Sequence, residues 1–400
     1  MNSIVYEQAL SALVNEVTAV DSTEMIALMQ VKGRVLAEDI VARFDAPLFD
    51  NSAMDGYAIC DLEQKQWQII DQISAGDPSK HIQLSRGQAV RIFTGAAIPQ
   101  GTDAVIAQED CELKNQFLRT GLDLKHMQHI RFRAEEYTLG DVLLDAGKVM
   151  SATDIGVATS QGYTYLNCVK KIKVCVFSSG DELQNIGNTL AENQIYDSNR
   201  LMLLSLLEEH GFDVIDGGIL TDDLNSIKKQ LKHAADHSDV ILLSGGASVG
   251  DKDYSKIALQ QLGKLHFWKL KIKPGKPFAW GQIAQIPTFL LPGNPVASWV
   301  TFLILVLPAL KKISGLTHAS YLPKRFQAEA HFELNKTCNR QQFMRGNISF
   351  IDGKIFAEIS KNQGSAMLST CSYSNALIVI PPETLVTQGQ KVDVIYLSSN

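Results

Sequence analysis

The sequence lacks the cysteine patterns that build a metal site or a disulfide framework. Its six cysteines are scattered along 400 residues, none belongs to a CxxC pair, and no cluster of histidines lies near one. We therefore expect neither a zinc site nor a set of structural disulfides.

Strong net charge and membrane signals are lacking as well. The formal net charge of −6 gives no basis for binding nucleic acid or an anionic membrane surface. The first ten residues, MNSIVYEQAL, have neither the basic start nor the apolar core of a signal peptide. The longest apolar stretch, Val296–Leu310, is shorter than a bilayer span and contains Pro308, which predicts a buried helix. We expect a cytoplasmic protein with no nucleic-acid or membrane partner.

The composition is that of a folded protein, with 45% hydrophobic and 20% charged residues. Its length predicts roughly three or four domains. Apolar residues at helical spacing predict helices over Tyr6–Val17 and Ser22–Gln30, and Ser151 is a plausible N-cap for a helix running to about Ser160. Between them, residues 41–140 consist of short β-rich runs broken by Gly, Pro and Asp, which predicts a compact β-containing domain.

From Lys171 onward, predicted strands and helices alternate. Strands are predicted at residues 173–177, 213–218, 239–243, 266–270 and 288–293, and helices at 198–210, 224–237, after 254 and at 296–310. This alternation is typical of a doubly wound parallel sheet, which binds ligands at the carboxyl ends of its strands. A final block from about Tyr321 has period-two runs and a hairpin signal at Asp352–Gly353, which predicts a small β-barrel or sandwich.

Residues 239–254, DVILLSGGASVGDKDY, join a buried strand directly to a glycine-rich loop. Gly245, Gly246 and Gly250 allow backbone amides to converge on an anion such as phosphate. A glycine-rich loop alone fits a solvated turn equally well. Asp251 and Asp253 would repel a phosphate unless a divalent cation such as Mg²⁺ lay between them. The acidic pair, together with the lysines of KLKIKPGKP downstream, favours a phosphate site.

A second constellation is DNSAMDGYA, residues 50–58, whose carboxylates, amide and hydroxyl could ligate a metal or move a proton. On chemistry alone, a turn capped by Asp and Asn around Gly56 is the favoured interpretation. Thr94 and Gly95 in RIFTGAAIPQGTDAV read as ordinary turn chemistry by themselves.

Taken together, the motifs resemble those of the MoeA molybdopterin molybdenumtransferases. They are DNSAMDGYA, RIFTGAAIPQGTDAVIAQE, SSGDEL, IYDSN, SGGASVGDKDY, KPGKP, LPGNPVAS, MRG and QGS, in order between about Tyr6 and Leu397. The resemblance implies insertion of molybdenum from molybdate into adenylylated molybdopterin, with release of AMP. This is the last step of molybdenum cofactor synthesis.

The resemblance also implies a homodimer of four-domain subunits, with the active site between the DNSAMDGYA domain of one subunit and the α/β domain of its partner. Other implied partners are molybdopterin adenylyltransferase and further cofactor-synthesis proteins. The expected domains are residues 1–21 with 171–318 (α/β, molybdopterin-binding), 22–43 with 141–170 (helical and β linker), 44–140 (β-rich) and 319–400 (C-terminal β-barrel).

The resemblance implies site residues at the positions of this sequence that match the family's motifs. The catalytic set is Asp55, Thr94, Arg131, Glu136, Glu182, Asp222 and Asp253. The substrate-binding set is Ser244, Gly245, Gly246, Ser248, Gly250, Lys269, Lys273, Lys276, Pro292, Asn294, Pro295, Arg345 and Ser365. Mg²⁺ would be held by Asp251, Asp253 and Glu182. This chain departs from the family at Ala134, where a glycine is usual, and at Glu136, where an aspartate is usual.

Two other functions share part of this pattern. A molybdopterin adenylyltransferase has a SGGASVGD-type loop on a single domain, and the related gephyrin E domain is a non-catalytic scaffold that binds receptor peptides. The additional domains and DNSAMDGYA weigh against the first, and the absence of a fused adenylyltransferase domain weighs against the second. Molybdate and tungstate, both tetrahedral dianions, fit the same donors.

Overall fold

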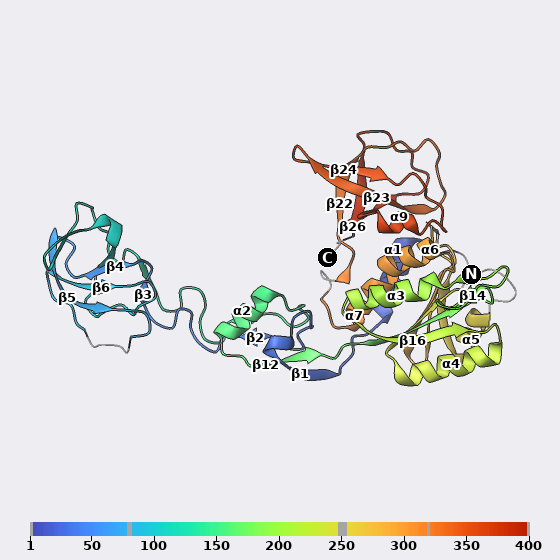
Figure 1. The fold of residues 1–400 in the computed structure, drawn as a ribbon, viewed down its shortest axis with the longest axis horizontal. Helices are drawn as coiled ribbons and strands as arrows, with labels where there is room; N and C mark the ends of the chain where they lie inside the picture. The colour runs from blue at the N-terminus through green and yellow to red at the C-terminus, as the bar shows by residue number, and fades with distance from the viewer. Residues whose placement is uncertain (1–2, 78–81, 247–253, 318–320, 398–400) are drawn as a thin grey trace. The chain divides into compact units, whose positions relative to one another are not determined.

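The computed structural model describes residues 3–77, 82–246, 254–317 and 321–397. The chain forms two compact units, shown in Figure 1. Unit 1 comprises Met1–Glu38, Gly147–Ser151 and Tyr165–Asn400, and unit 2 comprises Asp39–Ala146 and Ala152–Thr164. The finer division into four domains stays a prediction.

Unit 1 is built on a six-stranded sheet in the order β16-β13-β17-β21-β20-β18. The strands are β13 (Lys173–Ser179), β16 (Asp213–Leu220), β17 (Val240–Ser244), β18 (Gly263–Trp268), β20 (Ala279–Ile283) and β21 (Ile286–Leu291). β16, β13, β17 and β21 are parallel, while β20 runs antiparallel to both neighbours. After β13 the chain first goes to β16 on one side and then crosses to β17 on the other. The carboxyl ends of β13 and β17 therefore flank the switch point where such sheets bind ligands.

Helices cover both faces of this sheet (Figure 1), which confirms the predicted doubly wound fold. Successive residues of β13 alternate between the faces. Val174 and Val176 pack with α1 (Tyr6–Glu16), α3 (Ser198–Glu209) and the helix that begins at Pro295. Cys175 and Phe177 pack with α4 (Leu224–His237) and α5 (Tyr254–Leu262).

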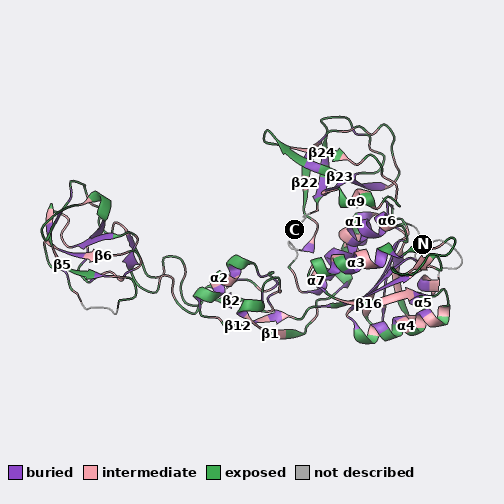
Figure 2. Cartoon of the chain, in the orientation of Figure 1, coloured by how far each residue is buried: buried purple, intermediate pink, exposed green. Residues whose placement is uncertain are grey.

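The predicted apolar helix runs through α6 (Pro295–Thr301), a π-helical turn (Phe302–Val306) and α7 (Leu307–Ile313). It is long and apolar enough to cross a membrane, but 83% of its most apolar window is buried inside the protein. It is therefore a core helix, as predicted. Figure 2 shows the same burial in the sheet strands that it covers.

Two sequence expectations were wrong. β20 was not predicted, because its hairpin turn is formed by Ala284 and Gln285 with φ of 50° and 71°, without the Asn-Gly type signal. Residues Ser22–Gln30 form no α-helix: β1 (Thr23–Ala27) pairs antiparallel with β12 (Tyr165–Val169), and Leu28–Gln30 form a single 3₁₀ turn. A helix this short is marginal, so pairing with a distant strand decides its structure.

The C-terminal part of unit 1 is a closed five-stranded barrel, as predicted. Its strands are β22 (Arg325–Ala330), β23 (Gln341–Ile351), β24 (Lys354–Ile359), β25 (Ala376–Ile380) and β26 (Lys391–Tyr396), closed by the β23–β25 pairing. The predicted Asp352–Gly353 turn joins β23 to β24, and both of its residues have positive φ. Outside the barrel ring, β19 (Ile272–Lys273) from the α/β part pairs in parallel with β23.

Unit 2 contains a six-stranded sheet in the order β7-β4-β6-β5-β9-β8. The strands are β4 (Gly56–Ile59), β5 (Gln66–Ile73), β6 (Gln88–Ile92), β7 (Ala104–Ala107), β8 (Glu112–Lys114) and β9 (Phe117–Arg119). Two-stranded ribbons join β3 (Asn51–Ser52) to β10 (Ile130–Arg131) and β2 (Ile40–Val41) to β11 (Val142–Leu144). α2 (Ala152–Ser160) occupies the predicted range.

Candidate active site

In unit 2, the DNSAMDGYA segment folds against the loop that follows β6. Ser52 N donates to Ala96 O at 3.0 Å, and Gly95 N donates to Ser52 O at 2.8 Å. Asp55 lies directly before β4, the strand that pairs with β6, and Thr94 lies just beyond the end of β6. Strand pairing thus brings together two residues that are 39 positions apart.

Asp55 and Thr94 form the most clearly defined polar contact of the DNSAMDGYA segment. The backbone N and the hydroxyl of Thr94 both donate to Asp55 Oδ1, at 2.8 and 2.7 Å. These bonds, first the backbone one, hold the pKa of Asp55 below its usual range, with desolvation opposing and Arg91 contributing weakly. Asp55 is exposed and ionised at neutral pH. A carboxylate with a low pKa is a poor proton acceptor, so it is better suited to hold a cation or a polar group of a substrate.

The segment around Arg131 lies beside the same motif. Arg131 pairs with Asn51 in the β10–β3 ribbon, and Arg133 N donates to Asp50 Oδ1 at 2.7 Å. The backbone N of Glu136 donates to Ala46 O at 2.9 Å, and the Glu136 side chain is exposed. The structure therefore brings Arg131 alongside the motif through the backbone. For the Glu136 carboxylate it shows no partner among the described residues.

Ala134, where the family usually has glycine, has φ of +60° and donates its N–H to Pro47 O at 3.0 Å. A Cβ in this left-handed region costs about 1–2 kcal/mol, which explains why glycine is usual here.

Ala134→Gly is expected to stabilise unit 2 by roughly 0.5–1 kcal/mol, because relief of this strain exceeds the extra backbone entropy of glycine. Hydrogen exchange of residues 44–59 and 128–140, followed by mass spectrometry, should slow by about two- to fivefold. The matched control is Ala146→Gly, at a residue outside the left-handed region, which should speed exchange. Faster exchange in Ala134→Gly would show that Ala134 is not strained.

In unit 1, polar groups gather at the carboxyl ends of β13 and β16. Ser179, the last residue of β13, donates its hydroxyl to Asp222 Oδ1 at 3.2 Å. The carboxylate of Glu182 folds back over Gly180, since a Cβ at Gly180 would lie 2.6 Å from Glu182 Oε2. Glu182 and Asp222, both predicted as catalytic, therefore lie on the same sheet edge.

The glycine-rich loop that follows β17 starts at the same edge of the sheet. Gly245 has φ of +88°, and a Cβ there would lie 2.3 Å from Ser179 O, so only glycine lets the two loops meet. Ser248, Gly250, Asp251 and Asp253 lie outside the described residues, and their roles stay predictions.

Asn199 is a site residue that sequence reasoning did not select, although it lies in the IYDSN motif. Its Nδ2 donates to Ser244 Oγ at 2.8 Å and to Gly293 O at 2.7 Å. Its Oδ1 is buried and has no hydrogen-bond partner among the described residues. Asn199 thus links the loop after β17 to the LPGNP loop. Its side-chain oxygen is a hydrogen-bond acceptor at the switch point that no described residue uses.

The lysine-bearing loop KPGKP and the loop that holds Ser365 both pack against α6. Lys273 is the last residue of β19, and Gly275 packs against α6 so closely that a Cβ would lie 2.5 Å from Thr301 Cγ2. Ser365 O accepts a hydrogen bond from Val296 N at 3.1 Å. The loops LPGNP and QGS, which carry Pro292, Asn294, Pro295 and Ser365, therefore meet at the start of α6, whereas KPGKP, which carries Lys273 and Lys276, packs against its last residue.

Arg345 is fully buried behind this convergence. Its guanidinium donates to the carbonyls of Asn362, Gln363 and Gly364 and to Thr370 Oγ1, at 3.0–3.3 Å. Burial lowers its pKa. Because carbonyls and a hydroxyl occupy these donors, the geometry favours Arg345 as the residue that positions the Ser365 loop.

Lys269 lies at the edge of this group. Its ammonium is 3.8 Å from the ring centroid of Trp268. The positive charge of Lys269 is therefore already engaged in a cation–π contact. A direct role for Lys269 in binding substrate stays a prediction.

The edge of unit 1 thus has two ends, with carboxylates beyond β13 and β16 and the Ser365 loop at the start of α6. Such an arrangement suits a ligand that carries both a cation-neutralised phosphate and a free anion. The LPGNP loop joins the two ends, because Gly293 binds Asn199 and Val296 binds Ser365. Asp55 and Thr94 belong to unit 2 of the chain.

Glu182 and Asp222 are oxygen donors of the kind that Mg²⁺ prefers. Within residues 3–77, 82–246, 254–317 and 321–397, no group of three Asp, Glu, His or Cys side chains is close enough to hold a metal. A complete magnesium site would therefore need ligands beyond these, such as substrate oxygens or the acidic loop.

Comparison with known proteins covers nearly the whole chain. Residues 4–162 match the "MoeA N-terminal region (domain I and II)", residues 175–312 a "probable molybdopterin binding domain" and residues 327–397 the "MoeA C-terminal region (domain IV)".

Full-length relatives and solved structures agree with these matches. The chain is 38% identical to a molybdopterin molybdenumtransferase of Haemophilus influenzae, over 97% of both chains. It is 33% identical to one of Nostoc, over 96% of this chain and 91% of that protein. Its fold matches the crystal structure of a molybdopterin biosynthesis moeA protein from Pyrococcus horikoshii, with a TM-score of 0.86, 29% identity and 99% of this chain and 100% of that chain covered.

Proposed function

Since the chain belongs to the MoeA family, we propose that it is a molybdopterin molybdenumtransferase, which inserts molybdenum from molybdate into adenylylated molybdopterin and releases AMP. The observation that carries the proposal is the edge of unit 1, where the LPGNP loop joins one end, at Asn199 beside the strand ends, to another end, at the Ser365 loop. A substrate with a phosphoanhydride and an incoming oxyanion requires both ends.

The proposed role of each residue follows from its charge and its hydrogen-bonding groups. The Gly246 amide and the Ser244 hydroxyl bind phosphate oxygens at the switch point. The Gly245 N–H donates to Leu291 O and so fixes the start of the loop. Lys273 and Lys276 neutralise molybdate and the charge that develops as the phosphorus–oxygen bond breaks. Asp55, already ionised and fixed by Thr94, orients the reacting group from the DNSAMDGYA side.

We further propose that turnover requires Mg²⁺, held by Glu182 with Asp251 and Asp253. The oxygen chemistry of Glu182 and its place on the phosphate edge support this assignment. When bound, the ion would screen the phosphate oxygens and so make the phosphorus easier to attack.

The active protein is proposed to be a cytoplasmic homodimer. The resemblance to the family implies that one subunit supplies Asp55 and Thr94, which belong to unit 2, and that its partner supplies Glu182, Lys273 and Ser365, which belong to unit 1. Molybdopterin adenylyltransferase is proposed as the partner that supplies the substrate, because its product is an adenylylated pterin.

The test is incubation of the purified protein with molybdopterin-AMP, with and without molybdate and Mg²⁺. AMP release and cofactor formation are expected only when both ions are present. Synthesis of the adenylate from ATP would instead identify an adenylyltransferase, and neither reaction would identify a scaffold. Full activity in the presence of excess chelator would contradict the magnesium requirement alone.

A further inference from the structure

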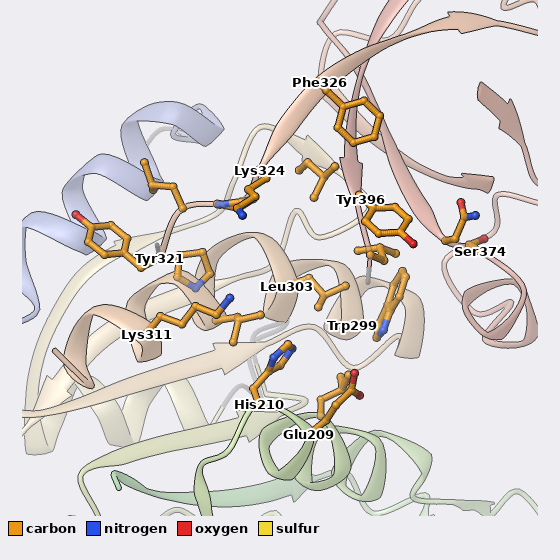
Figure 3. A pocket seen from close by; sticks show the side chains of 18 of the residues that line it. Glu209, His210, Trp299, Leu303, Lys311, Tyr321, Lys324, Phe326, Ser374 and Tyr396 are labelled. Atoms are coloured by element: carbon orange, nitrogen blue, oxygen red, sulfur yellow. The ribbon is translucent and has the colours of Figure 1, made fainter. Parts of the chain in front are cut away.

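Away from the candidate active site, unit 1 contains a cavity of about 810 Å³ between the end of α3, the helix α6–α7 and the barrel. Figure 3 shows its side chains converging from these three elements. A cavity of this size holds a small organic molecule. It contains none of the residues predicted for molybdenum transfer.

One end of the cavity is aromatic. Trp299 of α6 lies opposite Tyr396 of β26, with Phe326 of β22 beyond them (Figure 3). Tyr373 is 79% exposed and Tyr396 is 47% exposed, although both are large side chains. Exposed aromatic rings around a cavity suit the flat face of a ring-bearing ligand.

Several polar groups at this aromatic end are already in hydrogen bonds. Asn375 Oδ1 accepts from Ile348 N at 2.7 Å, its Nδ2 donates to Ile348 O at 3.2 Å, and Asn347 Oδ1 accepts from Asn375 N at 3.1 Å. The Ser374 hydroxyl donates to Thr370 O at 2.7 Å. A polar group of a ligand would therefore be bound mainly at the other end.

The other end is basic. There the cavity meets a second hollow of about 470 Å³, and the two share Glu209, His210, Lys311 and Lys324. In Figure 3 the ammonium of Lys311 lies between His210 and Lys324. No carboxylate of the described residues lies within 4 Å of the Lys311 or Lys324 ammonium.

Among the described residues, no carboxylate lies close enough to Lys311 to pair with its positive charge. Burial lowers the pKa of Lys311, and the nearby positive charge of Lys324 lowers it further. Burial, followed by the Lys311 charge, lowers the pKa of His210 to about 4, so its ring is neutral at pH 7. An anion at this junction would supply the missing negative charge and accept hydrogen bonds from both lysines.

We propose that this cavity is a second ligand site, which binds a small molecule with an aromatic ring and one anionic group. The ring lies among Trp299, Tyr373 and Tyr396, and the anion binds Lys311 and Lys324. The site is separate in its residues from the molybdenum-transfer site, so its ligand is expected to bind whether or not that site is occupied.

Phenyl phosphate is a suitable probe, with inorganic phosphate and phenol as its two halves. By isothermal titration calorimetry, the protein should bind phenyl phosphate more tightly than either half. Lys311→Met should weaken phenyl phosphate by about tenfold or more, because a charge-assisted hydrogen bond is lost. Tyr373→Ala should weaken phenyl phosphate by about threefold and leave inorganic phosphate unchanged.

Two control variants separate this site from other lysines. Lys229→Met and Lys232→Met, at exposed positions of α4, should both keep wild-type affinity for phenyl phosphate. Loss of affinity in either control, or unchanged affinity in Lys311→Met, would overturn the proposal, as would equal binding of phenyl phosphate and either half. The folded state of each variant is checked by its thermal melting curve.

Discussion

Asp55→Asn is expected to lower AMP release by at least about 100-fold while leaving the protein folded and dimeric. The substitution keeps the volume of the side chain but removes an ionised carboxylate from the substrate side of the site. Loss of one preorganised electrostatic contact typically costs two to three orders of magnitude in rate. The Thr94 N–H can still donate to the amide oxygen of the substituted side chain, so the turn should survive.

The measurement is single-turnover AMP release from molybdopterin-AMP, compared with Asp123→Asn as a matched control. Asp123 is a fully exposed carboxylate of the same unit, and its removal should leave the rate unchanged. If a well-folded Asp55→Asn protein releases AMP at a near-normal rate, Asp55 has a structural role only.

Mixing two inactive variants, Asp55→Asn and Lys273→Ala, should restore activity. In a heterodimer of these chains with a shared site, one site receives both wild-type residues and the other receives both substitutions. Activity should return to about half that of the wild type per heterodimer, because one of two sites is intact. The expected gain over either homodimer is therefore at least about 50-fold, given the effect of Asp55→Asn alone.

The heterodimer is confirmed by native mass spectrometry after subunit exchange, using one chain with an affinity tag. A matched mixture of Asp55→Asn with Thr94→Val places both changes on the same side of the site and should stay inactive. If exchange is complete and the first mixture also stays inactive, residues of one chain form the site, or both sites must be intact for turnover.

The helices α3 and α4 of unit 1 could be predicted from the sequence, and each begins at a residue whose side chain caps it. Asp197 accepts a hydrogen bond from Arg200 N at the start of α3, and Asp223 accepts one from Ser226 N at the start of α4. Elements fixed by distant partners did not follow, since β1 depends on β12 and the turn before β21 lacks glycine.

The sequence predicts which residues belong to the candidate site more readily than it predicts which of them contact one another. Asp55 and Thr94 were selected through family motifs, but no sequence spacing shows that strand pairing brings them together. Asn199 was overlooked because a buried amide has no periodic pattern. Arg345 was predicted as a direct donor, and only its burial reveals that its donors are used by loop carbonyls.

The pairing of β19 with β23 makes Lys273 part of two structures at once. The lysine begins KPGKP at the α/β edge, yet its backbone is anchored to a strand of the barrel. The barrel therefore anchors the backbone of the lysine that we propose to bind molybdate. Natural or engineered changes far away in the barrel should therefore appear in assays as altered use of molybdate, and should not be dismissed as mere losses of stability.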